Sequence, residues 1–247
     1  MSDSGALISA RDVSKIYRRG SEEVHALSGV SLDIARGEYV SIMGPSGSGK
    51  STLFNMIGGL DTPTTGEVSV EGYRLADLDS DQLAWFRCHK IGFIFQSFNL
   101  VTTMTALENV AVARVFAGIN PSQAHRDATR VLERVGLGHR LNNLPSQVSG
   151  GQQQRIAIAR ALVNVPLIIL ADEPTGNLDL RTGQEIINLL SEMKHAEGIT
   201  IITATHDMKM LSCSDRVVQI ESGSVARIST QDEVQITVGS IDGETVM

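Results

Sequence analysis

The chain has 247 residues, 42% of them hydrophobic, which is enough to bury the core of one large domain or of a core with lobes. Its formal net charge is −7, so no broad basic surface is available for a phosphate backbone, and we expect no nucleic-acid partner. No apolar run approaches the roughly 20 residues that span a bilayer, and the N-terminus lacks a basic and apolar signal region, so we expect the chain in the cytosol.

The first elements are short alternating apolar runs within residues 7–40, separated by polar turns, and they predict an antiparallel sheet. Tyr17 precedes one of these turns in a chain with only 4% aromatic residues. Its flat ring could stack on an adenine, whereas a half-buried strand position is the ordinary alternative.

The next element is a glycine-rich loop that begins after an apolar strand at residues 39–43 and leads into a helix at residues 52–57. The loop reads Gly44-Pro45-Ser46-Gly47-Ser48-Gly49-Lys50-Ser51, which is the phosphate-loop pattern. Its glycines let backbone N–H groups converge on phosphate oxygens, and the helix dipole favours the same charge. We therefore predict a nucleoside triphosphate site, with Lys50 on the β and γ phosphates and the Ser51 hydroxyl as a Mg²⁺ ligand.

A turn cluster and a strand at residues 67–72 follow and should complete the first sheet. Another buried strand, residues 91–95, carries Gln96 to its C-terminal end, where ligands bind in open α/β sheets. The amide oxygen of Gln96 can ligate Mg²⁺ there. Cys88 and His89 lack further ligands at metal-site spacing, so we interpret both as structural.

Residues 105–144 predict helices. Arg126, Arg130 and Arg134 recur every four residues along one of them, which favours a solvated face over a nucleic-acid stripe. Ser149 then caps a helix whose first residues are Gly150 and Gly151. Free N–H groups with little steric cover form a second anion-binding surface at this helix start, and one nucleotide does not need two such surfaces.

An apolar strand ends in Asp172 and Glu173, the place where phosphate-loop proteins handle Mg²⁺ and the attacking water. Asp172 would hold the metal, and Glu173 would orient the water and accept its proton; an exposed acidic turn is the alternative. His206 follows a strand at residues 200–204, and none of the other histidines has such a setting. A last strand and hairpin are expected at residues 216–224.

Taken in order, these motifs resemble the ATP-binding cassette ATPases of ABC transporters over roughly residues 7–224. They are the phosphate loop, the glutamine loop at Gln96, the signature at residues 149–152, the strand ending in Asp172 and Glu173, the D-loop at residues 176–179, and the switch His206. The resemblance implies an α/β fold with a RecA-like core, an antiparallel β lobe and a helical lobe at about residues 97–162. Residues 225–247 would be a C-terminal tail with no assigned role.

The resemblance also implies an ATP hydrolase that forms a head-to-tail homodimer. Two ATP molecules would lie at its interface, each held by the phosphate loop of one chain and the signature of the other. The catalytic residues would be Glu173 and His206, and the Mg²⁺ ligands Ser51, Gln96 and Asp172. The ATP-binding residues would be Tyr17, Val24, Gly44, Pro45, Ser46, Gly47, Ser48, Gly49, Lys50, Ser51, Thr52 and Gln96. The signature acting in trans would be Ser149, Gly150, Gly151 and Gln152, with Asp179 in the D-loop at the dimer interface.

Within the family, several segments, including Ala-Asp-Glu-Pro-Thr-Gly-Asn-Leu-Asp at residues 171–179, are most similar to the lipoprotein-release and macrolide-export group, LolD and MacB. This implies the ATPase subunit of an ABC transporter, peripheral at the cytoplasmic face of the cell membrane and bound to an integral membrane permease subunit. A non-transport ABC ATPase, such as a cell-division regulatory cassette, is the alternative. Two departures are Val148, where the family usually has Leu, and the stretch at residues 85–89.

Overall fold

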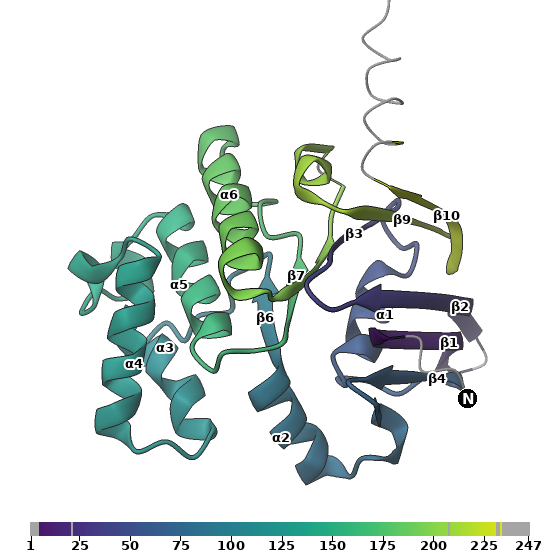
Figure 1. The fold of residues 1–247 in the computed structure, drawn as a ribbon, viewed down its shortest axis with the longest axis horizontal. Helices are drawn as coiled ribbons and strands as arrows, with labels where there is room; N and C mark the ends of the chain where they lie inside the picture. The colour runs from purple at the N-terminus through teal and green to yellow at the C-terminus, as the bar shows by residue number, and fades with distance from the viewer. Residues whose placement is uncertain (1–4, 21, 207, 231–232, 234–247) are drawn as a thin grey trace, which may run out of the picture. The chain divides into compact units, whose positions relative to one another are not determined.

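The structure is a computed structural model that describes residues 5–20, 22–206, 208–230 and 233. These residues form two compact units (Figure 1). The first joins the described residues up to 76 with those from 202 onward, and the second comprises residues 77–201. Most of the predicted C-terminal tail, residues 231–232 and 234–247, lies outside the described residues.

The first unit contains the predicted antiparallel sheet. Its strands are β1 (Ala6–Arg19), β2 (Glu22–Ala35), β4 (Thr65–Val70) and β5 (Tyr73–Arg74), in the order β2-β1-β4-β5. The strands β1 and β2 are each longer than the short runs that the sequence suggests. Register shifts along their pairing, including one between Ala10 and Val13, interrupt the alternation of apolar residues. For this reason one long strand looks like several short strands in the sequence.

A second set of strands in this unit carries the phosphate loop. The strand β3 (Tyr39–Met43) pairs in parallel with β9 (Arg216–Glu221), and β9 pairs antiparallel with β10 (Ser224–Thr230). The helix α1 (Lys50–Ile57) follows the loop. The 3₁₀ helix η4 (Met208–Cys213) precedes β9. The predicted hairpin at residues 216–224 is confirmed, and its second strand continues to Thr230.

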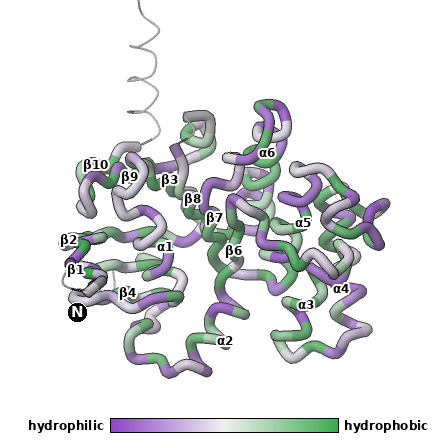
Figure 2. The backbone as a smooth tube through the Cα atoms, turned by 180° about the vertical axis from the view of Figure 1, so that it is seen from behind, coloured by the Kyte–Doolittle hydropathy of each residue, from purple (hydrophilic) through white to green (hydrophobic). Residues whose placement is uncertain are grey.

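The second unit is largely helical (Figure 1). Its helices are α2 (Ser80–Lys90), α3 (Ala106–Phe116), α4 (Pro121–Arg134), α5 (Gly150–Leu162) and α6 (Leu180–Glu197), with short 3₁₀ turns η2 (Gly138–Arg140) and η3 (Pro145–Gln147). Two of its strands, β6 (Ile91–Phe95) and β7 (Ile168–Asp172), pair in parallel and are predominantly hydrophobic in Figure 2. The strand β8 (Thr200–Ala204) and the 3₁₀ turn η1 (Leu75–Asp77) lie where the chain passes between units.

The sequence did not predict helix α2, since only Phe86 of its residues is buried and an apolar stripe is missing. Its start is nevertheless well defined. The Asp79 carboxylate accepts the N–H of Gln82 at 2.8 Å, and the Gln82 side-chain oxygen accepts the N–H of Asp79 at 3.0 Å. This capping box was the available local signal.

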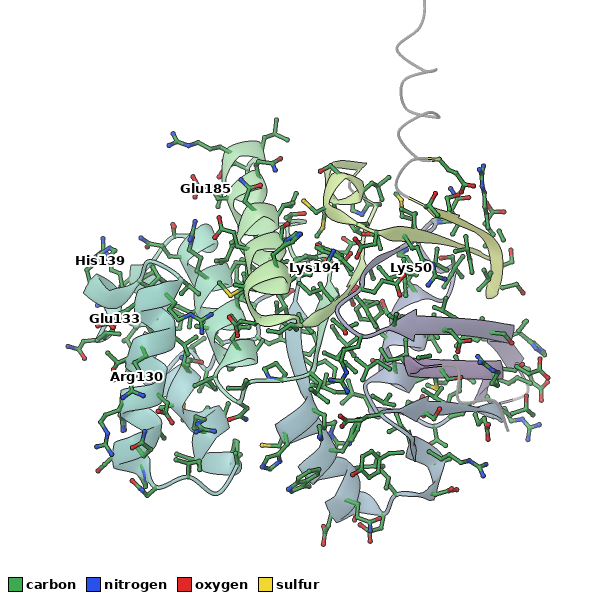
Figure 3. All side chains as sticks on the ribbon, viewed as in Figure 1. Lys50, Arg130, Glu133, His139, Glu185 and Lys194 are labelled. Atoms are coloured by element: carbon green, nitrogen blue, oxygen red, sulfur yellow. The ribbon has the colours of Figure 1, made fainter. Side chains whose placement is uncertain are left out.

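The surface of α4 agrees with its prediction. Ala124, Ala128 and Leu132 are buried, whereas Arg126, Arg130 and Arg134 are exposed. Figure 3 shows Arg130 and Glu133 pointing from the helix into solvent. Among the described residues, no helix is both long and apolar enough to cross a bilayer.

Candidate functional site

The phosphate loop lies in the first unit, between β3 and α1. Gly44 and Gly49 have φ angles of 157° and 107°. A Cβ atom on Gly44 would lie 2.2 Å from the carbonyl oxygen of Ile220, and one on Gly49 would lie 2.5 Å from that of Ala26. The carbonyl groups of Ile220 and Ala26 therefore leave no room for a side chain, and only glycine fits at these two positions of the loop.

Lys50, in the first turn of α1, directs its ammonium group onto this loop. Its Nζ atom donates to the carbonyl oxygens of Gly44 at 2.8 Å and Pro45 at 3.0 Å, and the side chain is buried. The Ser48 hydroxyl is also buried and makes no hydrogen bond within the described structure. A buried cation and an unsatisfied hydroxyl around a loop of glycines fit an incoming phosphate group, whose oxygens would satisfy both.

Tyr17 and Val24 lie opposite each other on β1 and β2. They are 39% and 56% exposed, so both present accessible apolar surface. The Tyr17 hydroxyl donates to Oδ2 of Asp61 at 2.9 Å, and Asp61 follows the end of α1. The predicted base-stacking residue is thus connected to the helix of the phosphate loop within one unit.

His206 also belongs to the first unit, two residues past the end of β8. The preceding N–H, that of Thr205, donates to the carbonyl of Ile42 in β3 at 3.1 Å. Buried hydroxyls fix the same region, because Ser41 Oγ lies 2.9 Å from Thr203 Oγ1 and 2.6 Å from Ser214 Oγ. The backbone before His206 is therefore anchored to the strand that leads into the phosphate loop.

The second unit brings Gln96, Asp172 and Glu173 together. Phe95 and Asp172 are register partners in the parallel pair β6 and β7, so Gln96 and Glu173 follow them at the same edge. A Cβ atom built on Gly176 would lie 2.8 Å from Gln96 Nε2 and 3.3 Å from Glu173 Oε2. The amide and the carboxylate therefore both border Gly176. The oxygen atoms of this group suit Mg²⁺, which prefers such ligands.

The turn after β7 has an unusual backbone. Glu173 has a φ angle of 44°, a left-handed conformation that is uncommon for a residue with a side chain. Its carbonyl accepts the N–H of Gly176 at 3.1 Å, and Asn177 Nδ2 donates to the carbonyl of Gln96 at 2.9 Å. Left-handed residues of this kind gather at functional sites, where the surrounding structure holds them in place. The sequence had no signal for the contacts of Gly176 and Asn177 with the Gln96 segment.

The signature residues begin α5 in the second unit. Ser149 is the N-cap, and its hydroxyl accepts the N–H of Gln152 at 3.3 Å. A Cβ atom on Gly151 would lie 2.2 Å from Thr182 Cγ2, so α5 starts in close contact with the first turn of α6. Asp179 caps that turn through Thr182, accepting its N–H at 3.0 Å and its hydroxyl at 2.6 Å. These hydrogen bonds lower the pKa of Asp179.

Cys88 and His89 both contact neighbouring groups in this unit. Asn164 Nδ2 donates to the carbonyl of Cys88 at 2.9 Å, and the His89 ring stacks on Trp85 with centroids 4.5 Å apart. Burial raises the pKa of the Cys88 thiol. In the part of the chain that the structure describes, no group of three or more His, Cys, Asp or Glu side chains forms a metal site.

Comparison with known proteins gives a consistent family. The model of the family described as ABC transporter matches residues 27–176. An uncharacterized ABC transporter ATP-binding protein of Thermotoga maritima is 49% identical and covers 90% of this chain and 95% of its own length. The macrolide export ATP-binding/permease protein MacB of Hyphomonas neptunium is also 49% identical over 89% of this chain, which spans only 34% of that relative.

A solved structure supports the same fold. The dimeric post-hydrolysis state of the ATP-binding cassette MJ0796, bound to ADP and Pi, superposes with a TM-score of 0.85. It is 44% identical in sequence and covers 91% of this chain and 99% of its own. The relative designated MJ0796 in Methanocaldococcus jannaschii is described as an uncharacterized ABC transporter ATP-binding protein, and it is 47% identical over 90% of this chain.

The fold and the phosphate loop define an α/β ATPase of the cassette type, which confirms the predicted fold class. The chain belongs to the ABC transporter family, and it is an ATP-binding and ATP-hydrolysing cassette of that family. The residue-by-residue roles given above remain predictions.

Proposed function

We propose that this chain is the ATPase subunit of an ABC transporter of the export or lipoprotein-release type, and that it drives a separate integral membrane permease subunit. The relatives named MacB and the pyoverdine export ATP-binding/permease protein PvdT support this, because the chain matches 34% and 36% of their lengths. A permease on a second chain would complete the same assembly. The cassette would then lie peripherally at the cytoplasmic face of the membrane.

The arrangement of Lys50 is the observation that carries the proposal. Its ammonium is held over the phosphate loop by the carbonyls of Gly44 and Pro45, beside the buried Ser48 hydroxyl. Backbone N–H groups of residues 44–51 would bind the phosphates of ATP, with Thr52 in the following turn. Lys50 would exchange its carbonyl partners for phosphate oxygens, a stronger charge-assisted interaction.

The proposed catalytic residues are Gln96, Asp172 and Glu173 of the second unit together with Ser51 and His206 of the first. Mg²⁺ would be held by oxygens of Ser51, Gln96 and Asp172, and it would neutralise charge that develops on the phosphates. Glu173 would orient the attacking water and accept its proton. His206, anchored next to β3, would contact the γ phosphate.

We further propose a head-to-tail homodimer with two ATP molecules at its interface. Each nucleotide would be bound by the phosphate loop of one chain and by Ser149, Gly150, Gly151 and Gln152 of the other, with Asp179 at the interface. The dimeric structures of the MJ0796 cassette support this arrangement. The domain limits that go with it are residues 7–224 for the cassette and about 97–162 for the helical lobe, which includes α3, α4 and α5.

Glu173→Gln tests the enzymatic part. The variant keeps its size and hydrogen-bonding capacity, so it should bind ATP normally, yet lose about 10²- to 10⁴-fold in turnover. Size-exclusion chromatography should then show an ATP-dependent dimer. Glu192→Gln, which changes an exposed carboxylate on α6, is the control and should hydrolyse ATP normally. Normal turnover by Glu173→Gln would contradict the assignment.

The transport part needs a separate measurement. A tagged chain purified from detergent-solubilised membranes should bring down a permease that stimulates its ATP hydrolysis and moves a substrate in vesicles. Copurification of a permease without any substrate movement would favour the regulatory alternative.

A further inference from the structure

We propose that Asp61 is a positioning residue that holds the Tyr17 ring in the orientation needed to stack on the base of a bound nucleotide. This inference rests on the predicted role of Tyr17 as the residue on which the adenine base of the nucleotide stacks. All the residues involved belong to the first unit, and their contacts converge on one carboxylate.

Both oxygens of Asp61 are used. Oδ2 accepts the Tyr17 hydroxyl at 2.9 Å. Oδ1 accepts Lys15 Nζ at 2.6 Å and the N–H of Thr62 at 2.7 Å. Lys15 also donates to the carbonyl of Thr62 at 2.7 Å, so the carboxylate cannot rotate without breaking several bonds. The hydroxyl end of the tyrosine is therefore tied to a fixed point.

The faces of the Tyr17 ring are not equivalent. The Lys15 ammonium lies over the ring, 5.0 Å from its centroid, in a cation–π contact. The residue keeps 39% of its surface exposed. Because the cation lies over one face, a planar base would stack on the other.

The same network connects the ring to the phosphate loop. The N–H groups of Leu60 and Asp61 both donate to the carbonyl of Asn55 in α1, at 2.9 and 3.2 Å. Tyr17 is thus connected, through Asp61, to the C-terminal part of the helix that begins with Lys50. The helix that follows the phosphate loop therefore also holds the carboxylate that accepts the Tyr17 hydroxyl.

The charge states favour this bond at neutral pH. Burial acts to raise the pKa of Asp61, but the hydrogen bonds from Lys15, Thr62 and Tyr17 outweigh it and leave the pKa lowered. Burial first, and the Asp61 contact second, raise the pKa of Tyr17. A neutral phenol therefore donates to a charged carboxylate, and such charge-assisted bonds are roughly twice as strong as neutral ones.

The test separates base binding from phosphate binding. Isothermal titration calorimetry would measure the Kd of MgADP and, separately, of inorganic pyrophosphate with Mg²⁺. Tyr17→Ala should weaken MgADP by about 5- to 100-fold, since one base–aromatic stack is worth that much. Asp61→Ala should weaken MgADP by about 3- to 10-fold, because the ring remains but is no longer held. Pyrophosphate should bind both variants as it binds the unaltered protein.

Two further variants make the result specific. Asp61→Asn keeps the volume and one acceptor oxygen, so it should fold and lose less MgADP affinity than Asp61→Ala. The double variant Tyr17→Ala with Asp61→Ala should bind MgADP no more weakly than Tyr17→Ala, because Asp61 acts through Tyr17. Asp33→Ala removes a carboxylate that pairs with Arg11 in the same sheet, and it should leave both affinities unchanged.

Equal losses for MgADP and pyrophosphate in the Asp61 variants would overturn the inference, since they would indicate a structural defect of the loop. Unchanged MgADP affinity in Asp61→Ala would overturn it as well. If Tyr17→Ala itself bound MgADP normally, both the stacking of the base on Tyr17 and this inference would be refuted. The proposed ATPase function would still stand on the Glu173→Gln result.

Discussion

Gly176→Ala should impair ATP hydrolysis without destabilising the protein. The added Cβ would lie 2.8 Å from Gln96 Nε2, and ordinary contact begins at 3.4 Å, so the amide must retreat by about 0.6 Å. Glu173 Oε2, at 3.3 Å, must shift slightly as well. Because misplacement by about 1 Å at a catalytic site can cost 10²-fold, we expect kcat to fall roughly 10- to 100-fold.

The expected change in stability is small. The φ angle of Gly176 is not positive, so alanine meets no backbone strain, and the clashing Gln96 amide is the end of an exposed, flexible side chain. Replacing glycine also restricts the unfolded chain, which offsets the contact by about 0.4–1 kcal/mol. The unfolding free energy should therefore change by less than about 0.5 kcal/mol.

The assay is steady-state hydrolysis over a range of MgATP concentrations, with urea unfolding beside it. Gly183→Ala is the matched control, because its Cβ would lie 3.6 Å from Thr175 Cβ, in ordinary contact, within α6. It should hydrolyse ATP normally and unfold at the same or a higher urea concentration. An unchanged kcat for Gly176→Ala would refute the reasoning that hydrolysis depends on this placement of Gln96 and Glu173.

Two further predictions concern the segment after Gln96. Asn109 is fully buried, and its side chain accepts the N–H of Val101 at 2.8 Å and donates to the carbonyl of Met104 at 2.9 Å. Asn109→Leu should therefore destabilise the protein by about 2–4 kcal/mol in urea unfolding. Asn188→Leu, which changes an exposed residue, should change the unfolding free energy by under about 0.5 kcal/mol. Phe98 is half-buried, and its ring lies 3.8 Å from a Cβ built on Gly150. If Phe98 also borders the permease, Phe98→Asp should leave the isolated chain folded but abolish the stimulation of ATP hydrolysis by the permease. Retained stimulation would count against that contact.

The local elements of the site could be predicted, because each motif carries its own context. The strand, loop and helix around Lys50 follow from a short pattern, and so does the Ser149 cap. The sequence also placed Gln96 and Asp172 at strand ends, and the parallel register of Phe95 with Asp172 brings these two ends side by side. Long-range information was needed only to choose which strands are neighbours.

Other features depend on contacts that no local pattern encodes. Tyr17 and Asp61 are 44 residues apart, and the turn that contains Asp61 resembles any polar turn in the sequence. The left-handed backbone of Glu173 is held by the surrounding turn rather than by its residue type. Helix α2 was not predicted from the sequence because Phe86 is its one buried residue, although its capping box was present.

The central claim is that each ATP is bound by the phosphate loop of one chain and the signature of another. Lys50→Ala and Ser149→Arg should each inactivate both sites of a homodimer, so neither variant alone should dimerise with ATP. In an equimolar mixture, one site of the mixed dimer would carry both lesions, and the other would pair an intact phosphate loop with an intact signature.

The measurement is ATP-dependent dimer formation by the mixture, followed by size-exclusion chromatography with light scattering. Dimer closure is a better readout than turnover, because coupling between the two sites could depress hydrolysis even when one site is complete. The account predicts a dimer in the mixture and in neither variant alone. If each chain built its own complete site, every site in the mixture would carry a lesion, and the absence of any ATP-dependent dimer would contradict the account.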